Sequence, residues 1–109
     1  MLKNIILFLF VINTANASEF LVVQSTTSTA DSGLYDFLLP KYEEKTGIDI
    51  RVVAVGTGQA IKNAKNGDGD LLIVHSEDDE NEFIKNGYGI ERKKLMYNDF
   101  IIIGPKKDP

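Results

Sequence analysis

Apolar and polar residues alternate along the chain in blocks that predict short strands separated by helices. Residues 20–23, 48–55 and 71–74 are apolar runs rich in β-branched side chains, which is typical of strands. Apolar residues with helical spacing follow in residues 34–45 and 59–66, and the first of these segments places on one face Leu34, Phe37, Leu38 and Tyr42. We also expect an acidic helix over residues 77–86 and a last strand over residues 95–103.

This alternation predicts an α/β fold. Strands separated by single helices of this length are typical of parallel β-α-β units with right-handed crossovers, so we expect an open, mostly parallel sheet with flanking helices on both faces. Pro40 is expected to interrupt the first long helix and Gly47 to end it. In open sheets of this kind ligands bind outside the carboxyl ends of the strands, which is where we look for a site.

Residues 1–17 are expected to be a signal peptide. Lys3 precedes an apolar run over residues 5–12, and residues 15–17 read Ala-Asn-Ala, a small-residue cleavage pattern. The run is too short to span a bilayer. We therefore expect a mature chain of residues 18–109 located in the periplasm, with a buried N-terminal strand as the alternative.

Charge and cysteine content narrow the classes of partner. The formal net charge is −4 and there is no basic stripe, which argues against nucleic acid and against anionic membrane surfaces as partners. The sequence contains no cysteine and hence no disulfide partner, so a packed core must stabilise the exported chain. These features favour a bacterial envelope protein.

Five consecutive hydroxyl side chains stand where the first strand is expected to lead into a helix. Residues 25–29 read Ser-Thr-Thr-Ser-Thr, and we expect the helix to start near Asp31 with Ser32 as its N-cap. Backbone N–H groups at a helix start have no intrahelical acceptor, and hydroxyls add donors without adding charge. We interpret the segment as an oxyanion site, with a plain Ser/Thr-rich capping loop as the alternative.

A second turn repeats this chemistry. Gly56-Thr57-Gly58 follows the strand at residues 48–55, and it lacks the third glycine of a dinucleotide fingerprint and the lysine of a P-loop. Two such turns after neighbouring strands can converge on one anion. Arg92 would add the positive charge that hydroxyls lack, and a surface basic cluster at residues 92–94 is the alternative.

Other candidate chemistry is weaker. His75 is the only histidine, and we interpret it as a hydrogen-bonded residue at a strand end. A secreted serine hydrolase, with Ser28 or Ser32 as nucleophile and His75 as base, is the alternative from another class, but the sequence has no Gly-x-Ser-x-Gly turn. Residues 66–77 imitate the spacing of a calcium loop, yet Leu71 stands where that loop requires glycine. We expect no catalytic residue, no metal ligand and no cofactor.

The ordered set of motifs resembles the TupA family, the tungstate-binding proteins of bacterial tungstate ABC transporters. The resemblance runs through residues 25–34, 55–60, 67–75, 92, 96–100 and 104–105. It implies a partial first lobe, over residues 18–109, of a type II periplasmic-binding-protein fold whose second lobe is built by chain beyond residue 109. It also implies a binding protein, not an enzyme, that captures tungstate and delivers it to a membrane permease.

The same resemblance implies a set of ligand residues. The oxyanion would be held by two turns, with an arginine adding charge: Ser25, Thr26, Thr27, Ser28, Gly56, Thr57, Gly58 and Arg92. Ser25 stands where the family usually has threonine and keeps the hydroxyl. Molybdate and phosphate remain alternative ligands, and phosphate would favour a site with an acceptor carboxylate, for which Asp31 is the nearest candidate.

Overall fold

The protein folds around a three-stranded parallel sheet. The computed structural model describes residues 18–97, 99 and 101–107. The strands are β1 (Phe20–Thr26), β2 (Asp49–Val55) and β3 (Leu71–Ile73), in the spatial order β2-β1-β3. Thr26 pairs with Val55 and Ser25 pairs with Ile73, so all three strands end on the same side of the sheet. We call this side the carboxyl edge.

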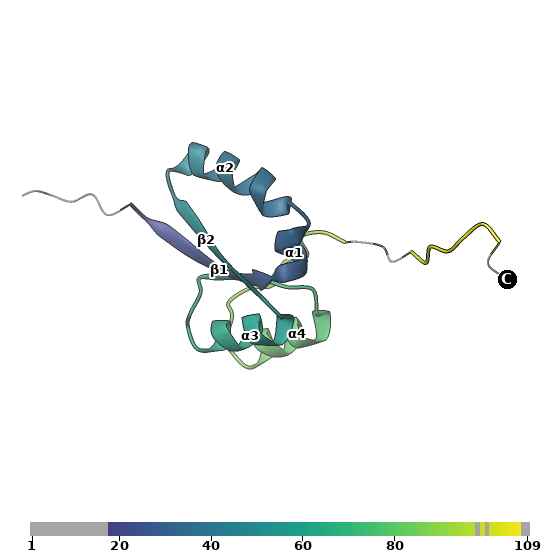
Figure 1. The fold of residues 1–109 in the computed structure, drawn as a ribbon. Helices are drawn as coiled ribbons and strands as arrows, with labels where there is room; N and C mark the ends of the chain where they lie inside the picture. Colours follow the sequence, from purple (N-terminus) through teal and green to yellow (C-terminus); the bar gives the residue numbers. More distant parts are fainter. Residues whose placement is uncertain (1–17, 98, 100, 108–109) are drawn as a thin grey trace, which may run out of the picture.

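Helices cover both faces of the sheet. They are α1 (Thr27–Asp31), α2 (Leu34–Thr46), α3 (Thr57–Lys65) and α4 (Glu77–Lys85). Figure 1 shows α2 on one face, α3 and α4 on the other, and α1 at the end of β1. The predicted α/β fold, an open parallel sheet with flanking helices, is confirmed.

β1 is the central strand, and its second half is buried because β2 and β3 lie on either side of it. Successive side chains of a strand point to opposite faces. Gln24 accordingly reaches α3, where its Oε1 accepts a hydrogen bond from Asn63 Nδ2 at 3.0 Å, and Ser25 reaches Tyr35 of α2. The buried apolar residues are Val23, Tyr35, Ala60, Ile61 and Phe83.

The break expected in α2 at Pro40 is wrong. The helix runs through Pro40 without a break and ends where predicted, at Gly47, whose φ of 73° is left-handed. Phe37 and Leu38, which share the predicted apolar face, are 67% and 44% exposed, whereas Tyr35 is buried. The hydrogen bond between the Tyr35 and Ser25 hydroxyls joins α2 to the central strand of the sheet.

The predicted strand over residues 95–103 is also wrong for the residues described there, which are 95–97, 99 and 101–103. None of them is in a strand, and Ile102 is fully exposed. High β-propensity does not produce a strand when no neighbouring strand supplies backbone partners, and none pairs with these residues. No helix within the described ranges is both long and apolar enough to cross a bilayer.

Candidate functional site

The hydroxyl segment is divided between a strand and a helix. Ser25 and Thr26 belong to β1, and α1 begins at Thr27. Thr26 is the N-cap, since its Oγ1 accepts a hydrogen bond from the Thr29 backbone N–H at 3.3 Å. The helix expected to start near Asp31 is α2, which begins at Leu34, and the short helix α1 before it was not predicted. The N-cap expected at Ser32 is wrong by one residue, because Gly33 is the N-cap of α2, although Ser32 Oγ accepts a hydrogen bond from the Leu34 N–H at 3.3 Å.

The Ser25 hydroxyl is fully buried and has no proton for a ligand. It donates to the Ile73 carbonyl oxygen at 2.9 Å and shares a second hydrogen bond with the Tyr35 hydroxyl. A serine hydroxyl has one proton. Because the Ile73 carbonyl can only accept, the Ser25 proton is used inside the protein. Ser25 therefore stabilises the carboxyl edge by connecting β1 to β3 and α2.

The next three hydroxyls lie progressively closer to solvent. Thr26 is 2% exposed, and its Oγ1 lies 3.2 Å from Ser28 Oγ and 2.8 Å from Thr29 Oγ1. Thr27 and Ser28 are exposed. Ser28 Oγ also lies 3.1 Å from Nε2 of His75, two residues beyond β3. The turn after β1 is thereby hydrogen-bonded to the end of β3.

The turn after β2 is open. Gly56 is the N-cap of α3 at φ −67°, and a Cβ added to Gly56 or Gly58 would meet nothing within 4 Å. The first bond of this helix runs from the Ala60 N–H to the Gly56 carbonyl at 2.9 Å, so the N–H groups before Ala60 lie outside the helix's own ladder. Neither backbone conformation nor crowding requires glycine here, which leaves room for another group to approach these donors.

The carboxyl edge places the three segments in a row. Thr26 and Val55 are register partners at the ends of neighbouring strands, which in sheets lie about 4.8 Å apart, and Thr27 and Gly56 directly follow them. His75 follows β3 on the other side of β1. The two predicted turns are therefore neighbours at one edge of the sheet. This arrangement presents hydroxyl and amide donors, the groups that a fully deprotonated oxyanion accepts.

Arg92, which follows α4 in the sequence, packs against the first turn of that helix. Its Nε is 2.7 Å from Glu80 Oε2, and one terminal nitrogen is 3.4 Å from Glu77 Oε1. The Arg92 side chain is 23% exposed and that of Glu80 is 18% exposed. The structure thus opposes the guanidinium charge with two carboxylates, and an anion would have to compete with them.

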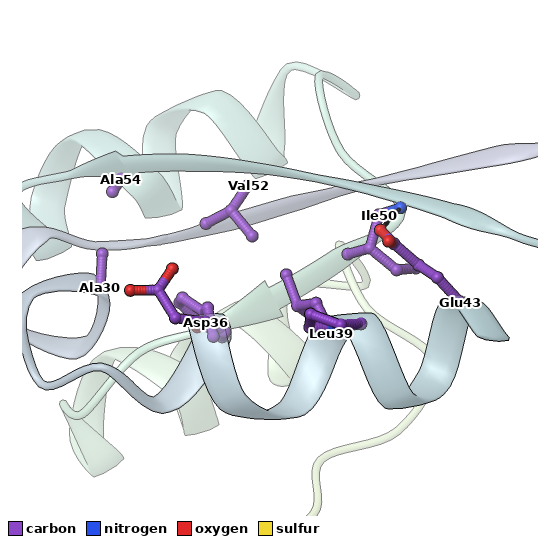
Figure 2. Close-up of a pocket in the computed structure, with 9 residues that line it drawn as sticks. Ala30, Asp36, Leu39, Glu43, Ile50, Val52 and Ala54 are labelled. Carbon is purple, nitrogen blue, oxygen red and sulfur yellow. Dashed lines mark hydrogen bonds between the residues drawn. The ribbon is translucent and has the colours of Figure 1, made fainter. Parts of the chain in front are cut away.

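The hollow between α2 and β2 is unsuited to an anion. It has a volume of about 370 Å³, and Figure 2 shows side chains of α2 turned toward β2 across it. The Asp36 and Glu43 carboxylates stand among apolar neighbours, and Glu43 accepts a hydrogen bond from the Ile50 N–H at 3.0 Å. Two carboxylates disfavour a dianion. The lining residues are Ala30, Tyr35, Asp36, Leu39, Pro40, Glu43, Ile50, Val52 and Ala54.

The calcium-like segment is committed to the fold. Asp70 Oδ2 accepts from the Val22 N–H at 2.9 Å, and the Asp68 carbonyl accepts from Gln24 Nε2 at 2.7 Å. In the part of the chain that the structure describes, no group of three or more potential ligand side chains could hold a metal ion.

Ser28 and His75 make the contact that the hydrolase alternative requires. A catalytic histidine also needs a carboxylate to orient its ring, and among the described residues none is hydrogen-bonded to His75. The sequence paired Ser28 with His75 only as nucleophile and base of the hydrolase alternative. It missed Tyr35, although a hydroxyl in a central strand always needs a buried partner.

Comparison with known proteins identifies the family. The family described as PBP superfamily domain matches residues 13–109. The chain belongs to this family. The tungstate-binding protein TupA of Peptoclostridium acidaminophilum is 54% identical over 93 residues, which are 85% of this chain and 32% of that protein. Its relatives are named as binding proteins, in agreement with the prediction that this PBP superfamily chain is not an enzyme.

Solved structures agree with the fold. The tungstate-binding protein TupA of Desulfovibrio alaskensis G20 superposes with a TM-score of 0.81 at 48% identity, covering 84% of this chain and 36% of that one. The tungstate ABC transporter structure from Geobacter sulfurreducens gives a TM-score of 0.79 at 51% identity, covering 86% and 40%. The predicted resemblance to the TupA family is confirmed, and this PBP superfamily chain spans about a third of the length of the curated relatives it matches.

Proposed function

We propose that this chain is part of an extracytoplasmic solute-binding protein that captures tungstate for uptake by an ABC transporter. The observation that carries the proposal is the register of β1 and β2, by which the turns at residues 27–28 and 56–58 leave neighbouring strands at one edge. The names of the similar proteins from Peptoclostridium acidaminophilum and Desulfovibrio alaskensis support tungstate as the ligand.

The proposed chemistry is recognition by donors alone. Tungstate at neutral pH is a tetrahedral dianion without a proton, so each of its oxygens only accepts hydrogen bonds. The proposed donors are the hydroxyls of Thr27, Ser28 and Thr57 and the backbone amides of the turn at Gly56 and Gly58. Thr26 and Ser25 are proposed to stabilise the site without contacting the anion. Thr26 caps α1, and Ser25 connects β1 to α2 and β3.

Arg92 is proposed to contribute charge to this edge at a cost. Glu80 and Glu77 already accept from its guanidinium, so an approaching anion gains only the part of the attraction that these carboxylates leave. We therefore assign the larger share of the affinity to the neutral donors.

Calorimetric titration tests the ligand assignment. The protein expressed from its complete reading frame is titrated with tungstate, molybdate, phosphate and sulfate. We expect tungstate to bind most tightly and sulfate far more weakly, because a smaller anion of equal charge leaves some donors out of reach. Equal affinity for sulfate would contradict recognition by size. Phosphate binding that strengthens as pH falls would favour the phosphate alternative.

Export and transport belong to the same proposal. We propose that residues 1–17 are a signal peptide cleaved after Ala17; these residues lie outside the described part of the structure. Mass spectrometry of the periplasmic fraction should give a protein that starts at Ser18. Tungstate uptake by cells that lack the gene tests the delivery to a membrane permease, and unchanged uptake would contradict it.

A further inference from the structure

A short chain of side-chain hydrogen bonds connects the proposed anion site to the only histidine of the sequence. His75 Nε2 lies 3.1 Å from Ser28 Oγ, and Ser28 Oγ lies 3.2 Å from Thr26 Oγ1. Thr26 Oγ1 lies 2.8 Å from Thr29 Oγ1 and accepts from the Thr29 backbone N–H. His75 is exposed at the end of this chain, while Thr26 at the other end is buried.

The direction of the hydrogen bond between His75 and Ser28 decides what Ser28 offers to an anion. A serine hydroxyl has one proton, and an oxyanion accepts only. If Nε2 is unprotonated, it accepts a hydrogen bond from the Ser28 hydroxyl, and Ser28 then presents only oxygen lone pairs to the anion. If Nε2 carries a proton, it donates to Ser28 Oγ, and the Ser28 proton is free to point at the anion. The imidazolium form of histidine allows only the second arrangement.

We propose that His75 is a positioning residue of the anion site, whose Nε2–H turns the Ser28 hydroxyl proton toward the bound oxyanion. This inference rests on the proposed function, and it adds a residue and a regulation that the two turns alone do not contain. A neutral ring donates from Nε2 in only one of its two tautomers, whereas the imidazolium always donates and its positive charge also attracts a dianion. Binding of the dianion therefore favours the imidazolium form of His75 and takes up a fraction of a proton. By linkage, affinity rises as pH falls through the range in which free histidine titrates.

The other charged groups near His75 are carboxylates, lysines and an arginine. The helix α4, which starts two residues later, has four acidic residues in its first turn, and Arg92 pairs with two of them. Asp31 ends α1, and the lysines of α3 lie in its last turn, away from the carboxyl edge. Carboxylates ordinarily titrate near pH 4 and lysines near pH 10, so a slope around pH 7 points to His75. The residues concerned are Asp31, Lys62, Lys65, Glu77, Asp78, Asp79, Glu80 and Arg92.

The test is calorimetric titration with sodium tungstate between about pH 8.5, where free histidine is neutral, and about pH 6.5, where it is about half protonated. We expect the affinity of the wild-type protein to rise by about fivefold from the upper to the lower limit. Repeating the titration in buffers with different ionisation enthalpies should reveal uptake of a fraction of a proton per anion. An affinity and a proton count that do not change with pH would overturn the inference while leaving tungstate binding intact.

Substitutions at His75 separate positioning from mere structure. His75→Leu removes the donor and should lower affinity at pH 6.5 by about tenfold, the cost of one misdirected hydrogen bond to a charged ligand. His75→Gln has an amide that does not titrate and whose NH2 can donate to Ser28 at every pH, so it should restore part of that affinity and show no pH slope. Equal behaviour of the two variants would overturn the inference, and if His75→Leu does not fold, the slope of His75→Gln decides alone.

A serine pair supplies the matched control. Ser28→Ala should flatten the pH slope, because His75 then has no hydroxyl to orient. Ser32→Ala removes a hydroxyl from the same segment, one that donates to the Thr29 carbonyl at 2.6 Å, and should keep the wild-type slope. A slope in Ser28→Ala as steep as in wild type would mean that His75 acts by charge alone and would overturn the positioning role. Absence of tungstate binding by the wild-type protein at any pH would instead overturn the proposed function.

Discussion

Two glycine-containing segments look alike in the sequence and differ in what their polar groups contact. Residues 66–70, Asn-Gly-Asp-Gly-Asp, precede β3, whereas residues 56–58, Gly-Thr-Gly, follow β2. A Cβ added to Gly69 would lie 2.8 Å from Gln24 Cγ, while one added to Gly56 or Gly58 would meet nothing within 4 Å. The first segment is packed against the sheet, and the second is open.

The closed segment uses its polar groups within the protein. Gln24 donates to the Asp68 carbonyl and accepts from Asn63, and Asp70 binds the Val22 backbone through both its side chain and its N–H. The open segment leaves the first amides of α3 outside any helical bond, and among the described residues the Thr57 hydroxyl has no partner. A polar loop whose hydrogen bonds are satisfied internally stabilises the fold, and one whose donors remain free can bind a ligand.

Gly69→Ala gives the largest expected effect. The added methyl must displace Gln24, a buried side chain that holds both Asp68 and Asn63, so we expect the free energy of unfolding to fall by about 2.5 kcal/mol. Urea denaturation measures the change. Gly56→Ala is the matched control, and the open space at Gly56 predicts a change below about 0.5 kcal/mol. Equal destabilisation by both variants would erase the distinction between closed and open segments.

Ser25→Ala tests whether the Ser25 hydroxyl, like the polar groups of the closed segment, stabilises the fold and does not bind the ligand. Its loss leaves the Tyr35 hydroxyl and the Ile73 carbonyl without a buried partner, and we expect a destabilisation of about 2 kcal/mol. The folded variant should bind tungstate with nearly wild-type affinity. A large loss of affinity with unchanged stability would return Ser25 to the ligand set that the family resemblance implies.

The sequence was sufficient for the layout of the fold and the edge at which the turns meet. Runs such as residues 20–23 and 48–55 predict strands, and parallel connections place the ends of the strands together. The sequence was insufficient to assign a role to each hydroxyl. That role depends on where β1 ends and on whether a side chain of another element, such as Tyr35 of α2, reaches the hydroxyl. The pattern also predicted a strand over residues 95–103, whereas the residues described there are exposed and lack the neighbouring strand that a strand needs.

Thr57→Val addresses the open segment directly. Valine keeps the shape of threonine and removes the hydroxyl donor, so we expect tungstate affinity to fall by about tenfold, equivalent to about 1.5 kcal/mol for one hydrogen bond to a charged ligand. The melting temperature should stay nearly constant, because the Thr57 hydroxyl is not the cap of α3. A lower melting temperature with unchanged affinity would show that the Thr57 hydroxyl stabilises the helix and does not bind the anion.

Arg92→Ala has a smaller expected effect on binding than Thr57→Val and tests whether Arg92 serves the anion or the fold. The guanidinium makes its shortest contact with Glu80, and both side chains are mostly buried, so part of its charge is already balanced. We expect affinity for tungstate to fall by about 1 kcal/mol or less, smaller than the loss from Thr57→Val, together with a loss of stability of similar size. Both are measured on one preparation, by calorimetry and by urea denaturation.

Glu80→Gln decides between the two roles of Arg92. The substitution removes the carboxylate that holds the guanidinium while keeping a hydrogen-bond acceptor, so Arg92 gains effective positive charge. If Arg92 serves the anion, tungstate affinity should rise, most clearly at low ionic strength where attraction between charges is least screened. If Arg92 only fastens the segment after α4 to that helix, stability falls and affinity does not change. In that case Arg92 stabilises the fold, as the closed segment does, and the donors at the carboxyl edge bind the anion without a full positive charge.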